Sequence, residues 1–185
     1  SALNILGISN QDRQHISEFL DNVNFGNSQN IIGLSTMYSD PSDERINRTF
    51  KKFEKRQYSD LPPLMDLDML GKDEKHLFDV TNQIGREVSV GFPPALLRGL
   101  ARWPKLLPII WNTLSMIEAD GRLEQLKQKS RDEAFKNSSI LASQINRINA
   151  PEVGEQVLEQ LKNLTQGGIP RMLPVGLLLH KMLSK

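Results

Sequence analysis

Apolar residues in this chain recur three and four positions apart, which is the spacing that places side chains on one face of a helix. This spacing is carried near the start by Ile16, Phe19, Leu20 and Val23, and further on by Ile46, Phe50 and Phe53. No stretch shows sustained alternation of apolar and polar residues, which is the pattern of a half-buried strand. The sequence therefore predicts an all-α fold.

Residues that start and stop helices predict where these segments end. Ser9, with Asp12 three positions on, is typical of a helix start, and Gly26 predicts the end of that helix. Asp40 before Pro41 predicts the next start. Further helices are expected over about 72–90, 94–102, 104–117, 123–148, 151–166 and from 170 onward, with a linker over 59–70, where two prolines stand together. In the helix over 123–148, the residues expected to face the core are Leu126, Leu141, Ile145 and Ile148.

Composition excludes several classes of function. The chain has 185 residues, 38% of them hydrophobic, which is enough for one domain with a core. The net charge is +1, from 23 basic and 22 acidic residues without a basic tract, so we expect no nucleic-acid partner. Cysteine is absent, which excludes thiol peroxidase chemistry and cysteine-ligated metals. The three histidines, His15, His76 and His180, show no ligand spacing, and we expect neither a metal nor a cofactor.

The sequence also predicts where in the cell the protein is located. No basic segment followed by an apolar run is seen near residue 1, which predicts no signal peptide. The longest apolar run, MLPVGLLL at 172–179, is too short to cross a bilayer. We therefore expect a cytoplasmic protein that does not associate with membranes.

The segment GGIPRMLPVG at 167–176 combines glycines, prolines and an arginine in an apolar run. A phosphate-binding loop would need a lysine after the glycines and a strand before them, and neither is present. With an offset of 141 residues, the segment aligns with residues 26–35, and Glu18, Leu20 and Asn22 then align with identical residues. One interpretation is a repeated unit of helix, glycine break and apolar helix, with Gly167 and Gly168 as the break. The alternative is a chance likeness between two amphipathic helices.

Three segments carry a resemblance to a known family. They are PPALLRGLARWPKLLPIIWNTL at 93–114, ADGRLEQ at 119–125 and GGIPRMLPVGLLL at 167–179. Together they resemble the DehI-type (group I) 2-haloacid dehalogenases, a branch of the AhpD-like helical superfamily. The resemblance implies an AhpD-like helical bundle in which residues 1–58 are the end of a first repeat with a connecting helix, and residues 59–185 are a complete repeat. It also implies a homodimer, or packing against a first repeat that precedes this chain.

The resemblance implies binding of a small carboxylic acid in a cleft between repeats, with an aspartate before the LARWP segment activating water. Residues 92–96 are Phe-Pro-Pro-Ala-Leu and contain no carboxylate. We therefore predict a dehalogenase-like protein that acts on or binds a small carboxylic acid, and we expect no halide release from 2-chloropropionate. The alternative is a non-catalytic domain for interaction or oligomerisation.

Five residues are the candidates for binding such an acid. They are Arg98, Trp103, Trp111, Asn112 and Arg171. Each also has an ordinary structural interpretation: core packing for the tryptophans, helix-surface exposure for the asparagine, and pairing with a carboxylate for the arginines. For Arg171 we expect partial burial, with the guanidinium held by an acidic side chain, a carbonyl group at a helix C-terminus or an anion, because a buried cation needs acceptors.

Overall fold

A computed structural model of the chain describes residues 6–39, 63–86, 93–144 and 154–183. Every regular element in these ranges is helical, which confirms the all-α prediction. In chain order the elements are α2 (Asn10–Ser35), η1 (Leu67–Met69), α3 (Lys72–Gln83), α4 (Ala95–Leu100), η2 (Pro104–Leu106), α5 (Leu107–Ala119), α6 (Arg122–Gln144), α7 (Glu155–Asn163), η3 (Leu164–Gly168) and α8 (Ile169–Leu183). The helix expected after Asp40 lies outside the described residues.

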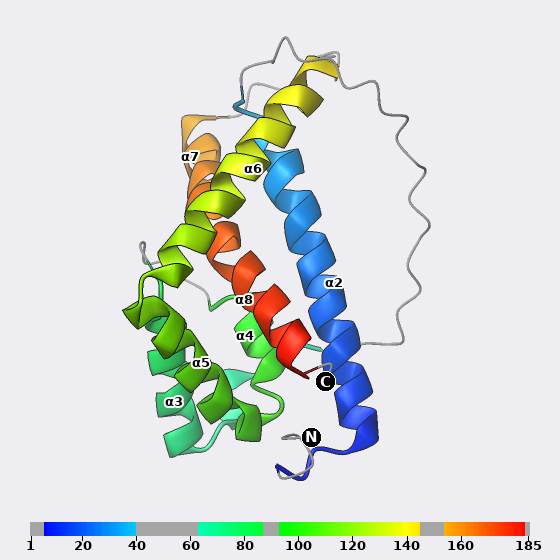
Figure 1. Cartoon of the computed structure of the whole chain (residues 1–185), viewed down its shortest axis with the longest axis vertical. Helices are drawn as coiled ribbons and strands as arrows, with labels where there is room; N and C mark the ends of the chain where they lie inside the picture. The colour runs from blue at the N-terminus through cyan, green and yellow to red at the C-terminus, as the bar shows by residue number, and fades with distance from the viewer. Residues whose placement is uncertain (1–5, 40–62, 87–92, 145–153, 184–185) are drawn as a thin grey trace.

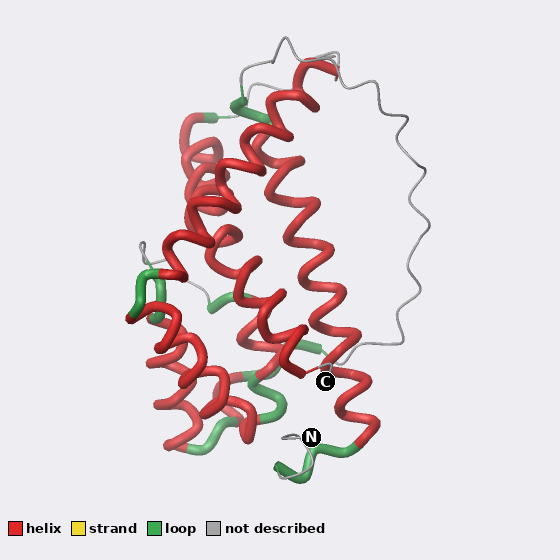
Figure 2. The backbone as a smooth tube through the Cα atoms, in the orientation of Figure 1, coloured by secondary structure: helices red, strands yellow, loops and turns green. Residues whose placement is uncertain are grey.

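Three helices form the centre of the bundle. Helices α2, α6 and α8 pack against one another, and α8 lies between the other two in the view of Figure 1. Helices α3 and α5 pack together at one end of this group, and α4 contacts α2 (Figure 2). One hydrophobic core joins all of these elements and includes Ile16, Leu20, Phe78, Leu97, Ile110, Leu123 and Val175. None of the described helices is long and apolar enough to span a bilayer.

Helix α2 begins as predicted but does not end where we expected. Ser9 is its N-cap, and the Ser9 hydroxyl accepts a 3.0 Å hydrogen bond from the amide of Asp12. The helix then continues through Gly26 to Ser35, so the predicted end at Gly26 is wrong. A glycine costs only about 1 kcal/mol in a helix interior. Packing of α2 against α6 and α8 on both sides of Gly26 outweighs that cost.

The second predicted break is also wrong. Helix α7 passes into α8 through the π-helical turn η3, which contains Gly167 and Gly168, without leaving helical conformation. Pro170 lacks an N–H group and cannot donate to the carbonyl of Gln166 four residues earlier. The Nε of Arg131, on α6, donates to that carbonyl instead. A tertiary contact thus supplies the donor that the proline removes, and the helix continues.

Of the four residues expected to face the core from the helix over 123–148, Leu126 is exposed, Leu141 is half-buried, and Ile145 and Ile148 lie outside the described residues. Leu126 is 41% exposed, while the next residue, Lys127, is only 1% exposed. The Lys127 ammonium donates to the carbonyl oxygen of Gly85 at 3.2 Å and to Oε2 of Glu124 at 2.7 Å. These acceptors let the aliphatic stem of the lysine fill a core position while its charge stays paired. The spacing of apolar residues alone therefore did not predict that Lys127, and not Leu126, faces the core.

Candidate functional site

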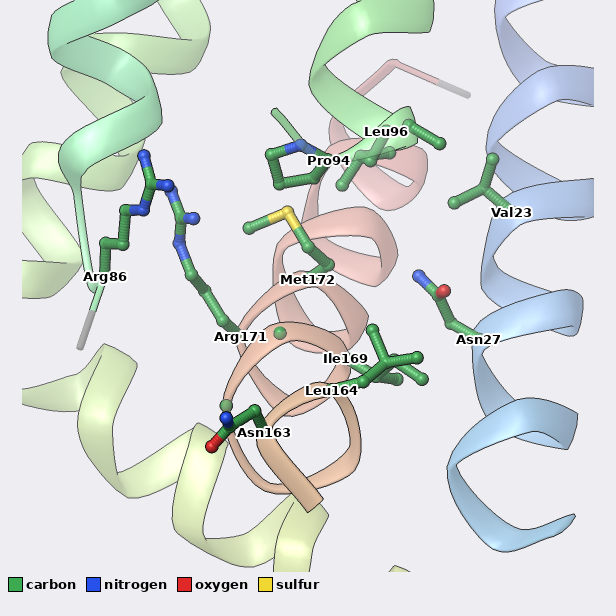
Figure 3. A pocket seen from close by; sticks show the side chains of 13 residues that line it. Val23, Asn27, Arg86, Pro94, Leu96, Asn163, Leu164, Ile169, Arg171 and Met172 are labelled. Carbon is green, nitrogen blue, oxygen red and sulfur yellow. The ribbon is translucent and has the colours of Figure 1, made fainter. Parts of the chain in front are cut away.

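A pocket of about 240 Å³ lies between α2, the start of α4 and the junction of α7 with α8. Its floor is the π-helical turn η3, and Arg86 reaches it from the turn that follows α3 (Figure 3). Its walls are mostly apolar. The lining residues are Val23, Asn27, Arg86, Pro94, Ala95, Leu96, Asn163, Leu164, Gly167, Gly168, Ile169, Arg171 and Met172.

The glycines and prolines explain why this region is hollow. Gly167 and Gly168 present no side chain, and an added Cβ on Gly167 would meet nothing within 4 Å. Pro94, the N-cap of α4, and Ala95 line the pocket with short side chains. Small residues on two segments thus leave open space beside Met172 and Leu96.

Arg171 forms part of one wall and is held by the end of a neighbouring helix. It is only 6% exposed. Its Nε donates to the carbonyl oxygen of Ile84 at 2.8 Å, and Nη2 donates to that of Asn82 at 2.6 Å. Both carbonyls belong to the C-terminal end of α3, where the helix dipole favours a cation. The expectation that carbonyl groups at a helix C-terminus hold this guanidinium is confirmed, and its burial is more complete than predicted.

Two arginines meet at this wall. Figure 3 shows the guanidinium groups of Arg86, from the turn after α3, and of Arg171, from α8, near each other. Burial, and next the charge of Arg86, lower the pKa of Arg171 to about 10, while the charge of Glu118 acts in the opposite direction. The guanidinium remains charged at neutral pH. Two guanidinium groups, with the charge of Glu118 acting on Arg171, thus bring N–H donors to one wall of an apolar space.

Glu118 also contacts the backbone of the turn that carries Arg86. Its Oε1 accepts a hydrogen bond from the amide of Gly85. Gly85 has φ +65°, and a Cβ there would lie 2.7 Å from Cδ2 of Leu123, so only glycine fits. The turn that carries Arg86 into the pocket is therefore held from α5 by Glu118 and from α6 by Lys127.

The other predicted arginine and the first tryptophan lie outside the pocket lining. Arg98 is half-buried, and its Nη2 donates to the carbonyl oxygen of Met65 at 3.3 Å. Trp103 is buried in the core, and its Nε1 donates to Oδ1 of Asp12 at 2.9 Å. Both side chains thus have structural partners, and neither of these contacts is directed at the pocket.

Trp111 and Asn112 are exposed on α5 and do not line the pocket either. The Asn112 amide contacts only the sulfur of Met116, at 3.9 Å, in the described contacts. Of the five predicted binding residues, Arg171 alone lines the pocket. Sequence reasoning missed Arg86 and Asn27, because a single arginine after a glycine and a single asparagine on a helix are common in any helical chain.

The described lining of this pocket supplies groups that can bind a ligand. Its described lining contains two arginines and two asparagines among apolar residues, and no carboxylate, imidazole or hydroxyl side chain. No group of three histidine, cysteine or carboxylate residues that could hold a metal ion occurs among the described residues. A general base within reach of a ligand is the minimum for hydrolysis by activated water, and the described lining offers none.

Fold and pocket together define the class: an all-helical protein with an apolar pocket that two arginines border. Comparison of the chain with family models, with curated proteins and with solved structures finds no match.

Proposed function

We propose that this protein binds a small carboxylic acid in the pocket between α2, α4 and α8 and does not act on it chemically. The observation that carries the proposal is the position of Arg86 and Arg171 at one wall of an otherwise apolar cavity. A carboxylate accepts hydrogen bonds from guanidinium groups in a paired geometry, which makes arginine the usual partner for this group.

The donors available to a ligand support this assignment. A guanidinium has five N–H groups, and the two bonds of Arg171 to carbonyl oxygens use two of them. These bonds also fix the side chain before any ligand arrives, so binding costs little side-chain entropy. A carboxylate beside Arg171 and Arg86 would accept hydrogen bonds from guanidinium N–H groups.

The proposal also accounts for the predicted loss of dehalogenase chemistry. The resemblance noted above implies an acid as ligand and an aspartate as base. Pro94, Ala95 and Leu96 line the pocket where the family would place polar residues, and all three are apolar. We therefore propose a protein that keeps a family-like acid pocket and uses it for binding.

Calorimetric titration with sodium propionate, butyrate and hexanoate tests this function. We expect saturable binding to the wild type, weakening of about tenfold in Arg86→Gln, and no change in Arg102→Gln. Arg102 is a matched control, because its guanidinium donates to the carbonyl oxygen of Pro63, outside the pocket lining. Chloride release from 2-chloropropionate should be absent. Lack of saturable binding by any linear carboxylate of two to ten carbons would overturn the proposal.

The second candidate is self-association, and the outer face of α5 favours it. Trp111 is 40% exposed and Met116 is 60% exposed on this helix. A homodimer that covered both would remove large apolar side chains from water. Sedimentation velocity of the wild type and of Trp111→Lys decides the matter, because a dimer through this face would dissociate in the variant. A monomeric wild type at high concentration would exclude this candidate.

A further inference from the structure

The size of the pocket constrains the ligand more closely than the arginines do. Its volume is about 240 Å³. An apolar cavity of about 150 Å³ is known to accommodate benzene, which corresponds to about 25 Å³ for each heavy atom. On that scale the pocket holds about ten heavy atoms. Propionate has five, so a two- or three-carbon acid would leave about half of the space unfilled.

The walls indicate what the remaining atoms are. Away from the two arginines the lining is mostly apolar, contributed by Val23, Leu96, Leu164, Ile169 and Met172, with Asn27 and Asn163 as its polar side chains. Figure 3 shows Val23 on the opposite side of Met172 from the arginines. Two arginines at one wall and mostly apolar side chains elsewhere are complementary to a molecule with one ionised end and a hydrocarbon tail.

We propose that the ligand is a linear aliphatic monocarboxylate of about eight carbons, with its carboxylate at Arg86 and Arg171 and its tail extending toward Val23. This inference rests on the proposed function and narrows its ligand class. Octanoate has ten heavy atoms, matching the volume. Met172 lies along the path of the tail, and its flexible thioether adapts readily to an alkyl chain.

A chain-length series is the first test. Calorimetric titrations use sodium butyrate, hexanoate, octanoate and decanoate below their micellar concentrations, with octan-1-ol and suberate as probes of charge. Burial of one methylene corresponds to about fourfold in affinity. We expect octanoate to bind about two hundredfold more tightly than butyrate, and little further gain for decanoate. Octanol should bind at least tenfold more weakly than octanoate. Suberate should also bind weakly, because its second carboxylate would lie beside Val23 and Asn27, where the described lining offers no cation.

Variants of Val23, which lies opposite the arginines, test the direction of the ligand's hydrocarbon tail. Val23→Phe shortens the pocket and should move the best ligand toward hexanoate. Val23→Ala lengthens it and should move the best ligand toward decanoate. Both variants keep the arginines and should leave butyrate binding within about threefold of the wild type. Arg86→Gln should weaken octanoate about tenfold and leave octanol unchanged.

The outcomes distinguish failure of the chain-length inference alone from failure of the proposed function. If butyrate binds and octanoate binds no more tightly, the chain-length inference is wrong while acid binding stands. If the affinity rises with chain length but neither Val23 variant moves the optimum, the tail does not lie here and the inference is again wrong. If octanol equals octanoate, the arginines do not select the ligand, and both proposals fail together. If no carboxylate binds at all, both likewise fail.

Discussion

The indole nitrogen of Trp103 donates a 2.9 Å hydrogen bond to Oδ1 of Asp12, a residue 91 positions earlier in the chain. Oδ2 of the same carboxylate accepts a 2.6 Å hydrogen bond from the hydroxyl of Ser9, the N-cap of α2. One side chain thus joins the start of the longest described helix to the segment between α4 and α5. This contact anchors α2, which supplies Val23 and Asn27 to the pocket.

Replacing Trp103 by phenylalanine should lower the free energy of unfolding by about 1–2 kcal/mol, because a hydrogen bond to a charged group and part of a buried ring are lost. Trp111→Phe is the matched control, since Trp111 lies exposed on α5, and we expect a change below 0.5 kcal/mol there. Urea denaturation followed by circular dichroism measures both. Equal effects of the two substitutions would contradict a structural role for the bond to Asp12.

The same bond should make stability depend on acid pH. The hydrogen bond from Ser9, and next that from Trp103, hold the pKa of Asp12 below its ordinary value. A carboxyl with a lowered pKa in the folded state stabilises the protein fully above its unfolded pKa of about 3.9, and that stability is lost as pH falls through the folded pKa. The difference in unfolding free energy between wild type and Trp103→Phe should therefore shrink below pH 4. A difference that stays constant from pH 7 to pH 2.5 would exclude Asp12 as its source.

Helices α2 and α8 approach closely where Asn24 meets Gly176. A Cβ added to Gly176 would overlap Oδ1 of Asn24, and neither polar atom of that buried amide has a hydrogen-bond partner among the described residues. We expect Gly176→Ala to destabilise by about 1–3 kcal/mol through overpacking. Asn24→Ala makes room, so the double variant should be more stable than additivity predicts.

Gly26→Ala, on α2, is the control for Gly176→Ala. Gly26 lies in the interior of the helix with open space around the position of an added Cβ. Gly26→Ala should therefore raise the free energy of unfolding by about 0.5–1 kcal/mol. Thermal denaturation of the wild type, the three single variants and the double variant measures these differences. Strict additivity of Asn24→Ala with Gly176→Ala would show that the two residues do not interact.

Arg131 and Pro170 should be energetically coupled through the carbonyl of Gln166. Arg131→Met removes the donor to that carbonyl. Pro170→Ala restores a backbone N–H that can donate to it from within the helix. The cost of Arg131→Met should therefore fall by about 1 kcal/mol in the Pro170→Ala background. The contacts of Arg131 with Glu124 and Gln128 are present in both backgrounds and cancel in the cycle.

Arg171→Met tests the buried guanidinium. The substitution leaves the carbonyl groups of Asn82 and Ile84 without these donors, which costs about 1–3 kcal/mol, while removal of a buried charge beside Arg86 offsets part of that cost. We expect net destabilisation by about 1–2 kcal/mol. Arg98→Met should cost less, because Arg98 is half-buried and makes a single 3.3 Å bond. A neutral effect of Arg171→Met would remove the structural role assigned to this side chain.

The sequence by itself determined the elements whose cause is local. Spacing of apolar residues predicted helices throughout the described ranges, and the Ser9–Asp12 pair placed the start of α2 correctly, because capping depends on residues that are neighbours in the chain. The apolar surroundings of Arg171 predicted its burial and its need for acceptors. These arguments require no knowledge of distant segments.

Tertiary structure decided the rest. Gly26 does not end α2, and Gly167 and Gly168 do not break the last helical segment, because contacts with α6 offset the local cost of glycine and proline. Lys127 rather than Leu126 faces the core, because the carbonyl of Gly85 accepts a hydrogen bond from its ammonium group there. Arg86 and Arg171 stand 85 positions apart, and only the packing of α8 against the end of α3 brings them to one wall. A pocket is the space that side chains from several elements leave between them, so no single segment of the sequence specifies it.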